Sequence, residues 1–359
     1  MNLPKFAIIG AGNGGQAFAG HLGLLGFSVN IYDVEAEKVE ALKKTNRMRL
    51  FGAVEGEAGI GRITHDIGEA ILGADIIMVV IPAVYQRSIA QAMAQFLTAG
   101  QIIILNPGAT GGALEVRNIF QKAGAPSDVI VGETDTLLYA CRSILPGEVQ
   151  IYGVKNELNL ATLPAAQAPR VVKLLNTAFP QFQPVDSVLH TSLNNLNAMM
   201  HPIPTLLNAG RIESRSAFDY YSDGVTPSVA RVVEQADQER VAVAKALGIT
   251  APTIRDNYAA FYGVEGKNLY EKVQQVKPYK GIKGPVTLDT RYLFEDIPTG
   301  LVPLSALGRA VGVGTPTMDA VVALSSTLLG RDFCREGRNL ENLGLAGKTP
   351  EKIREWVLE

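Results

Sequence analysis

The sequence has little cysteine and no long apolar run. Its two cysteines, Cys141 and Cys334, lie far apart without metal-ligand or redox spacing, so we expect free thiols in a reducing compartment and no metal site. The longest apolar run, ADIIMVVIPAV, is too short to cross a bilayer and suits a buried strand. The first residues, MNLPKFAIIG, lead directly into a strand without a signal-type segment. We therefore expect a cytoplasmic protein without a membrane anchor.

Charge is also sparse, and its two signs are balanced. Charged residues make up 19% of the chain, and the formal net charge is -2. This composition provides no electrostatic attraction to nucleic acid or anionic membranes, so we expect neither as a partner. With 359 residues, of which 47% are hydrophobic, the chain exceeds the usual size of a single core and predicts two domains.

The first half alternates short apolar runs with segments of helical composition. The runs KFAIIG, FSVNIYD, ADIIMVVIP, QIIILNPG and SDVIVGET occupy residues 5–10, 27–33, 74–82, 101–108 and 127–134. Strands that are apolar throughout are typical of parallel sheets that are covered on both faces. The sequence therefore predicts an α/β Rossmann-type doubly wound parallel sheet, a dinucleotide-binding domain over residues 1–185.

The turn after the first strand reads GAGNGG and matches the G-x-G-x-x-G pattern. Gly10 permits the tight turn, Gly12 lets the backbone approach a pyrophosphate, and Gly15 allows close packing of helix on strand. An ordinary glycine-rich turn is the alternative, but a strand precedes this one and a helix follows it. The candidate cofactor-binding residues of the turn are Gly10, Ala11, Gly12, Asn13, Gly14 and Gly15.

Asp33, at the end of the second predicted strand, bears on the choice of cofactor. A carboxylate there accepts hydrogen bonds from a ribose and repels a 2′-phosphate. Glu35 and Glu37 add negative charge, whereas Lys38 weakens the argument, so NAD is favoured and NADP stays possible. In such sheets the residues that follow the later strands border the cofactor. Here these are Pro82, Asn106 and Glu133, with Gly108 and Thr134 beside them. The ordinary preference of such residues for loops explains their positions equally well.

After Pro184 the strand rhythm ends, and we expect a helical domain over residues 186–359. Residues 226–248 predict a packing helix with Thr226 as N-cap and Gly248 as its stop. Residues 275–300 predict a Gly/Pro-containing loop with four basic side chains. Such a loop can close over an anionic substrate, but a charge run of this kind is more often simply solvated.

The helical domain opens with LHTSLNNLNAMMHP, in which polar residues recur at helical spacing. On one continuous helix, His190, Asn194, Asn197 and His201 form a narrow polar stripe beside leucine and methionine side chains. Buried polar groups need hydrogen-bond partners, so we expect this helix to line an interdomain cleft. Bridging between neighbouring helices is the alternative for the two asparagines. His190 is too far from His201 to share a metal.

Five motifs together resemble those of the opine dehydrogenases, the NAD/NADP octopine/nopaline dehydrogenase family. They are GAGNGG, LNPGATGGALEVR, GETDTLLYACR, SLNNLNAMMHPIPTLLNAGR and FEDIPTGLVPLSALGR, and they span nearly the whole chain in order. The resemblance implies a Rossmann domain followed by an all-α, 6-phosphogluconate-dehydrogenase-like substrate domain, and a homodimer built through it. It also implies a catalytic pair of His201 and Asp296. Spacing alone leaves Glu295 and Asp289 as alternatives to Asp296.

The resemblance implies NADH-dependent condensation of a 2-oxo acid, with pyruvate the first choice, and the amino group of an L-amino acid. This chemistry needs a group that titrates near neutral pH, and histidine suits it. A neighbouring carboxylate fixes the tautomer of the imidazole, which is the role expected of Asp296. The candidate substrate-binding residues are Asn194 and Asn197, together with Arg211, Lys283 and Arg291 for the carboxylates.

Two other functions remain open at this point. A reductase of one carbonyl substrate, of the ketopantoate reductase or glycerol-3-phosphate dehydrogenase type, has the same two-domain plan. A non-catalytic dinucleotide sensor keeps the cofactor site and uses the second domain to recognise a partner. Dependence of turnover on both an oxo acid and an amine separates the first function from these two.

Overall fold

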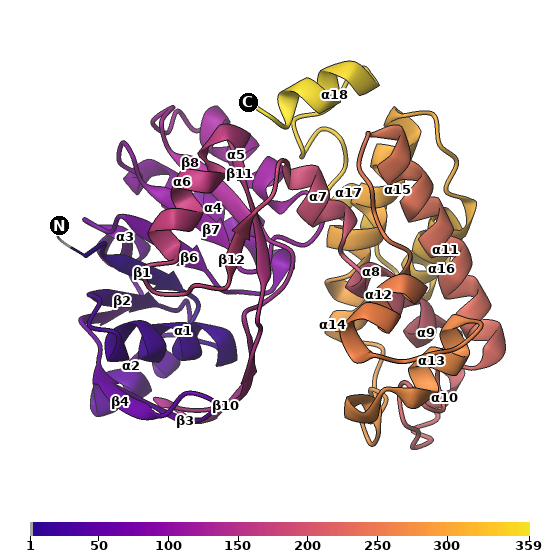
Figure 1. Cartoon of the computed structure of the whole chain (residues 1–359), viewed down its shortest axis with the longest axis horizontal. Helices are drawn as coiled ribbons and strands as arrows, with labels where there is room; N and C mark the ends of the chain where they lie inside the picture. Colours follow the sequence, from indigo (N-terminus) through magenta and orange to yellow (C-terminus); the bar gives the residue numbers. More distant parts are fainter. Residues whose placement is uncertain (1–2) are drawn as a thin grey trace. The chain divides into compact units, whose positions relative to one another are not determined.

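The computed structural model describes residues 3–359, and the chain divides into two compact units (Figure 1). The first unit runs to Thr191 and also includes Val357–Glu359, and the second is Ser192–Trp356. The sequence prediction placed the boundary after residue 185 and the whole C-terminus in the second domain. The end of the chain belongs to the first unit because the Ala165 N–H donates to the Leu358 carbonyl oxygen (3.0 Å) and Val357 is buried.

The first unit alternates strands with helices as predicted. Its elements are β1 (Phe6–Ile9), α1 (Asn13–Leu24), β2 (Val29–Tyr32), α2 (Ala36–Thr45), β3 (Arg47–Gly52), β4 (Gly56–Gly59), β5 (Arg62–Thr64), α3 (Ile67–Ile71), β6 (Ile76–Val79), η1 (Ala83–Tyr85), α4 (Gln86–Met93), η2 (Ala94–Phe96), β7 (Ile102–Leu105), α5 (Gly112–Lys122), β8 (Ile130–Thr134), β9 (Tyr139–Leu145), β10 (Glu148–Val154), β11 (Leu158–Leu163), η3 (Ala165–Gln167), α6 (Ala168–Leu175) and β12 (Phe182–Pro184). Helix α7 (Val188–Leu193) begins in the first unit and ends in the second.

Within residues 3–359 the strands form two sheets. The larger has eight strands in the order β12-β11-β8-β7-β6-β1-β2-β5. Its pairs are parallel from β8 to β5, and β11 runs antiparallel to β8. All five strands predicted from apolar runs lie in this parallel part, so the predicted doubly wound sheet is confirmed.

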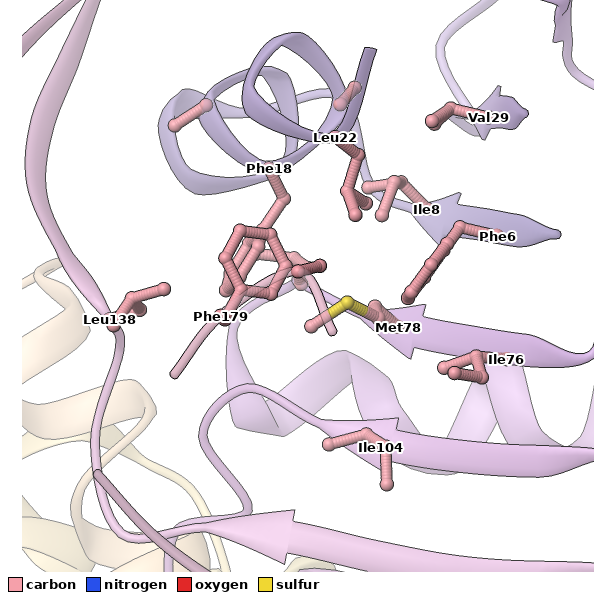
Figure 2. Packing of buried hydrophobic residues seen from close by; sticks show 14 of the residues in the cluster. Phe6, Ile8, Phe18, Leu22, Val29, Ile76, Met78, Ile104, Leu138 and Phe179 are labelled. Carbon is pink, nitrogen blue, oxygen red and sulfur yellow. The ribbon is translucent and has the colours of Figure 1, made fainter. Parts of the chain in front are cut away.

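The core of the first unit lies between the large sheet and its helices. Strands β1, β6 and β7 are buried at every position, as their unbroken apolar sequences predict. Figure 2 shows Phe18 and Leu22 of α1 packed over Ile8, Met78 and the neighbouring strand residues. Phe18 also meets Phe179 edge to face, with ring centroids 5.4 Å apart. This packing fixes α1, and with it the glycine-rich turn.

The smaller sheet, in the order β4-β3-β10-β9, was not predicted. It covers the other side of α1, where a Cβ on Gly20 would lie 2.8 Å from the Leu50 side chain and one on Gly23 would lie 2.7 Å from Ala58. Exposed residues interrupt the apolar pattern of β9 and β10, and β3 pairs with β10 from far away in the sequence. Local periodicity therefore gives little sign of this sheet.

The second unit is helical, as predicted. Its elements are α8 (Asn197–Met200), α9 (Pro202–Leu207), α10 (Ala209–Glu213), α11 (Pro227–Ala246), α12 (Ile254–Tyr262), α13 (Leu269–Gln275), η4 (Lys277–Tyr279), α14 (Arg291–Phe294), the π-helix η5 (Ile297–Leu301), α15 (Val302–Ala310), α16 (Pro316–Leu329), α17 (Phe333–Glu336) and α18 (Pro350–Trp356).

Helix α11 follows its sequence signals closely. The Thr226 hydroxyl accepts a hydrogen bond from the Val229 N–H (3.3 Å), and Gly248 has φ +79° beyond the last turn. The predicted N-cap and stop are confirmed. Among the described residues 3–359, no helix combines the length and the apolar character needed to cross a membrane.

Candidate active site

The glycine-rich turn between β1 and α1 has the geometry of a phosphate cradle. Gly10 has φ +107°, and a Cβ there would lie 2.6 Å from the Val80 carbonyl oxygen. A Cβ on Gly15 would lie 1.7 Å from the Gly10 carbonyl oxygen, so only glycine fits at either position. A Cβ on Gly12 would meet nothing within 4 Å, which leaves open space in front of the N-terminus of α1. The turn therefore fits a dinucleotide pyrophosphate.

Asp33 lies at the end of β2 and is 6% exposed. Its Oδ2 accepts the Ala11 N–H (2.8 Å), and its Oδ1 accepts the Glu35 N–H (3.0 Å). Lys38 Nζ is 3.3 Å from both carboxylate oxygens and 2.9 Å from Glu35 Oε1. Partial burial opposes the charge of Lys38, but Glu35 and Asp33 leave its pKa raised. The carboxylate is thus fixed beside the turn, where a ribose would bind.

The three residues predicted from the later strand ends differ in their environments. Pro82 is exposed between β6 and η1. Asn106 is 2% exposed, its Nδ2 donates to the Ile104 carbonyl oxygen (2.9 Å), and its Oδ1 is buried without a hydrogen-bond partner in the described part of the chain. A buried oxygen of this kind suits a ligand that donates a hydrogen bond.

Glu133 is completely buried and is held by the protein itself. Its Oε2 accepts the Ala113 N–H (2.8 Å) in the first turn of α5, and its Oε1 accepts the Thr191 hydroxyl (2.5 Å). A carboxylate at a helix N-terminus is stabilised by the free N–H groups there. The Glu133 side chain thus joins the end of β8 to the start of α5 and to Thr191, and its contact with the cofactor stays a prediction.

In the second unit, His201 and Asp296 form a hydrogen-bonded pair. His201 Nδ1 lies 2.7 Å from Asp296 Oδ2, and the side chains are 12% and 6% exposed. His201 joins α8 to α9, and Asp296 directly precedes the π-helix η5. Proton sharing at Nδ1 fixes the orientation of the ring and leaves Nε2 as the nitrogen for exchange with a substrate.

Two tyrosines that were not predicted hold His201 in place. The Tyr220 hydroxyl donates to the His201 carbonyl oxygen (2.6 Å), and burial raises the pKa of Tyr220 well above its usual value. The hydroxyl therefore stays protonated and able to donate. Tyr292 stacks on the imidazole of His201 with ring centroids 4.3 Å apart and an interplanar angle of 23°. Tyr292 lies four residues before Asp296, and this helical spacing was a signal in the sequence that could have pointed to it.

The predicted polar stripe on one continuous helix is wrong. Helix α7 ends at Leu193 and α8 begins at Asn197. The buried Arg240 donates from Nη1 to the Leu193 carbonyl oxygen (2.5 Å), which in a continuous helix would accept the Asn197 N–H. His190 consequently belongs to the first unit and His201 to the second.

The two predicted asparagines, Asn194 and Asn197, differ in their environments. Asn194 lies in the break, and its Oδ1 is buried without a hydrogen-bond partner among residues 3–359. Asn197 is exposed at the start of α8. Of these two asparagines, Asn194 is therefore the one with a buried oxygen that lacks a donor among the described residues, which suits a ligand.

The three basic candidates have different partners. Arg211 lies over the Phe218 ring, 4.4 Å from its centroid, and Lys283 Nζ is 2.6 Å from Asp219 Oδ1. Arg291 pairs with Glu295 (3.1 Å), and its side chain is 65% exposed. Arg291 directly precedes Tyr292, whose ring stacks on His201. Arg291 is thus the basic candidate nearest in sequence to Asp296.

The loop for which substrate closure and simple solvation were both considered is attached to the second unit. The Tyr220 N–H donates to the Ile282 carbonyl oxygen (2.7 Å), and the Gly284 N–H donates to that of Phe218 (2.9 Å). Tyr279 stacks on Tyr221 with ring centroids 3.8 Å apart. Part of the predicted loop is also helical, in α14 and η5. Within residues 3–359, no group of three or more His, Cys, Asp and Glu side chains is arranged to hold a metal.

Comparison with known proteins now identifies the family. Residues 184–329 match the model described as NAD/NADP octopine/nopaline dehydrogenase, alpha-helical domain, and residues 5–115 match the NAD-dependent glycerol-3-phosphate dehydrogenase N-terminus. An opine dehydrogenase from Arthrobacter sp. (strain 1C) is 48% identical over 358 residues, which cover 99% of each chain. The chain belongs to the opine dehydrogenase family.

Other relatives agree with this assignment. Protein ocs from Agrobacterium vitis, 29% identical, aligns over 98% of each chain. A solved structure of octopine dehydrogenase with NADH and L-arginine has a TM-score of 0.83 at 21% identity, covers 99% of this chain and 98% of its own, and shows the same fold. As a member of the opine dehydrogenase family, this protein is an NAD(P)-dependent oxidoreductase that acts on the CH–NH group of donors. The family predicted from the five motifs is confirmed.

Proposed function

We propose that the protein reductively joins a 2-oxo acid, with pyruvate as first choice, to the amino group of an L-amino acid, using NADH. Two observations support the cofactor: the open cradle in front of Gly12 and the buried carboxylate of Asp33, which repels a 2′-phosphate. When bound, NADH would supply the hydride for reduction of the imine carbon. One water is released and one proton is taken up for each product formed.

The His201–Asp296 hydrogen bond carries the proposal for the chemistry. The amino group arrives as an ammonium and must lose a proton before it attacks the carbonyl carbon. We assign this proton to His201 Nε2, because Nδ1 is engaged by Asp296. The carboxylate then stabilises the imidazolium, which returns a proton as the carbonyl oxygen leaves as water. Arg291 is proposed to bind a substrate carboxylate in competition with Glu295.

We propose further cofactor and substrate contacts from the hydrogen-bonding groups that the protein leaves available. The N–H groups at the start of α1, from Asn13 to Gly15, would hold the pyrophosphate. Asn106 Oδ1 and Asn194 Oδ1, both buried and unpaired, would accept hydrogen bonds from cofactor or substrate. We also propose a homodimer, which light scattering of the purified protein would test, and a cytoplasmic location.

The test follows NADH oxidation with pyruvate alone, with each of a panel of L-amino acids alone, and with both together. We expect oxidation only with both substrates, and a slower reaction with NADPH. Oxidation with pyruvate alone would contradict the condensation and favour a simple oxo-acid reductase. No oxidation with any pair, despite NADH binding, would contradict catalysis on these substrates.

Two histidine variants test the catalytic assignment. We expect His201→Ala to bind NADH with the affinity of the unmodified protein and to lose turnover by about 10²- to 10⁴-fold. His190→Ala is the matched control, since His190 lies in the same stretch, LHTSLNNLNAMMHP, but not beside Asp296, and should retain turnover. Equal turnover of the two variants would refute the role of His201.

A further inference from the structure

The peptide of Ala11, in the middle of the glycine-rich turn, is held from two sides. Its N–H donates to Asp33 Oδ2 (2.8 Å), and its carbonyl oxygen accepts Gln16 Nε2 (2.8 Å). Gln16 lies one turn into α1 and is 4% exposed. Asp33 is common to many dinucleotide sites. Gln16 is not part of the G-x-G-x-x-G pattern. Its side chain connects the glycine-rich turn to the β9–β10 hairpin.

The other end of the Gln16 amide binds the tip of the β9–β10 hairpin. Gln16 Oε1 accepts the Gly147 N–H (2.9 Å), and Nε2 is also 3.3 Å from Ser143 Oγ. Gly147 has φ +83° and lies in the tight turn between the two strands. A second contact joins the same regions, because Asn13 Oδ1 accepts the Ser143 N–H (3.0 Å). The hairpin tip is therefore attached to the first turn of α1.

We propose that Gln16 is a positioning residue for the dinucleotide, through which the β9–β10 hairpin sets the conformation of the pyrophosphate turn. This inference rests on the proposed use of the turn for NADH. The first N–H groups of α1 bind a phosphate well only when the preceding turn holds them in one arrangement. Without Gln16, the Ala11 carbonyl oxygen and the Gly147 N–H lose their partner together, and the turn is free to relax.

A residue that only stabilises the fold would affect the melting temperature and leave the affinity for NADH unchanged. A positioning residue affects the affinity as well. Gln16→Met keeps the length and volume of the side chain and removes its hydrogen bonds. We expect the Kd and KM for NADH to rise about fivefold or more, equivalent to about 1 kcal/mol. We expect kcat at saturating NADH to stay within about twofold, since the catalytic pair is unaltered.

His21→Phe is the matched control. His21 lies in the same helix, and its Nδ1 is 2.9 Å from the Tyr139 hydroxyl of the same hairpin. Its position is five residues beyond Gln16, more than one helical turn farther from the phosphate end. We expect His21→Phe to lower the melting temperature and to leave NADH affinity unchanged.

The measurement is the Kd for NADH by calorimetric titration, together with the melting temperature of each protein. Should Gln16→Met fail to fold, Gln16→Asn decides: its shorter amide cannot reach Ala11 and Gly147 at once, so we expect the same loss of affinity. Unchanged affinity in the folded variants, or equal losses in Gln16→Met and His21→Phe, would overturn the inference. Absence of NADH binding in the unmodified protein would instead refute the proposed function.

Discussion

Arg240 offers the strongest test of how packing in the second unit sets the position of His201. Its side chain is 0% exposed and donates to Asp237 Oδ1 (2.9 and 2.7 Å), to the Leu193 carbonyl oxygen (2.5 Å) and to the Pro252 carbonyl oxygen (2.7 Å). Arg240→Met keeps an apolar stem and removes the guanidinium. Asp237 then loses its counter-ion inside the unit, the Leu193 carbonyl oxygen loses the donor described above, and the Pro252 carbonyl oxygen keeps the more distant Asn257 Nδ2 (3.5 Å).

The burial of the Arg240–Asp237 pair determines the loss of stability expected for Arg240→Met. Removing one partner of a buried ion pair costs about 3–5 kcal/mol, because the remaining charge is left uncompensated. Burial raises the pKa of Asp237 even with Arg240 present, and the arginine opposes that rise. Without Arg240, the pKa of Asp237 should rise further, and the carboxyl should be protonated at higher pH.

Activity should fall for a separate reason. Once Arg240 is gone, the Leu193 carbonyl oxygen is free to accept the Asn197 N–H, and α7 can continue into α8. This continuation would turn the residues that lead to His201. A displacement of about 1 Å at a reacting group costs about 10²-fold in rate, so we expect a loss of kcat of that order.

Urea unfolding and steady-state kinetics of two variants separate these effects. In Arg240→Met/Asp237→Asn the uncompensated charge is absent, and the amide oxygen still serves the Ile254 N–H, which is 2.7 Å from Asp237 Oδ2. We expect the second change to restore about 1–3 kcal/mol of stability and none of the lost activity. A loss below about 1 kcal/mol in Arg240→Met, or recovery of kcat in the double variant, would refute this reasoning.

Three further predictions concern single side chains. Asp296→Asn should lower kcat by about 10²- to 10⁴-fold with unchanged NADH binding, and a loss below about tenfold would argue against the pair with His201. Tyr292→Leu removes the ring stacked on His201 and should lower kcat about 2- to 10-fold, whereas Tyr292→Phe should keep it; equal effects would exclude stacking as the cause. Burial lowers the pKa of His21 below 6.5, so the stability it contributes is complete above that pH and is lost as the pH falls and the unfolded chain takes up a proton. The stability difference between about pH 7.5 and about pH 5.5 should therefore be smaller in His21→Phe, and identical differences in urea unfolding would contradict the assignment.

The first unit was largely predictable because its signals are local. Each buried parallel strand is an unbroken apolar run, and the glycine pattern with Asp33 fixes the expected phosphate end. His201 and Asp296 are 95 residues apart, and only the resemblance to the opine dehydrogenases paired them before the structure was known.

The features that were missed depend on partners distant in the sequence. The break after Leu193 is tied to Arg240, 47 residues away, and periodicity within the segment cannot reveal such a donor. Glu133 was expected at a strand end bordering the cofactor, and the hydrogen bonds of its carboxylate to Ala113 and Thr191, 20 and 58 residues away, could not be read from the strand itself. The hydrogen bond from the Gly147 N–H to Gln16 Oε1 joins residues 131 apart, and neither local sequence indicates it.

The ion pair between Asp33 and Lys38 bears on how cofactor preference can change during evolution. Lys38 Nζ lies 3.3 Å from the Asp33 carboxylate, the group that would repel a 2′-phosphate. Acquiring a preference for the phosphorylated cofactor would thus require the loss of a negative charge and no gain of a positive one. The same carboxylate, however, accepts the Ala11 N–H and orders the turn. Asp33 therefore contributes both to the selectivity between the two cofactors and to the rigidity of the turn that binds them. A mutation of Asp33 that reduces the selectivity is expected to reduce the rigidity of the turn as well.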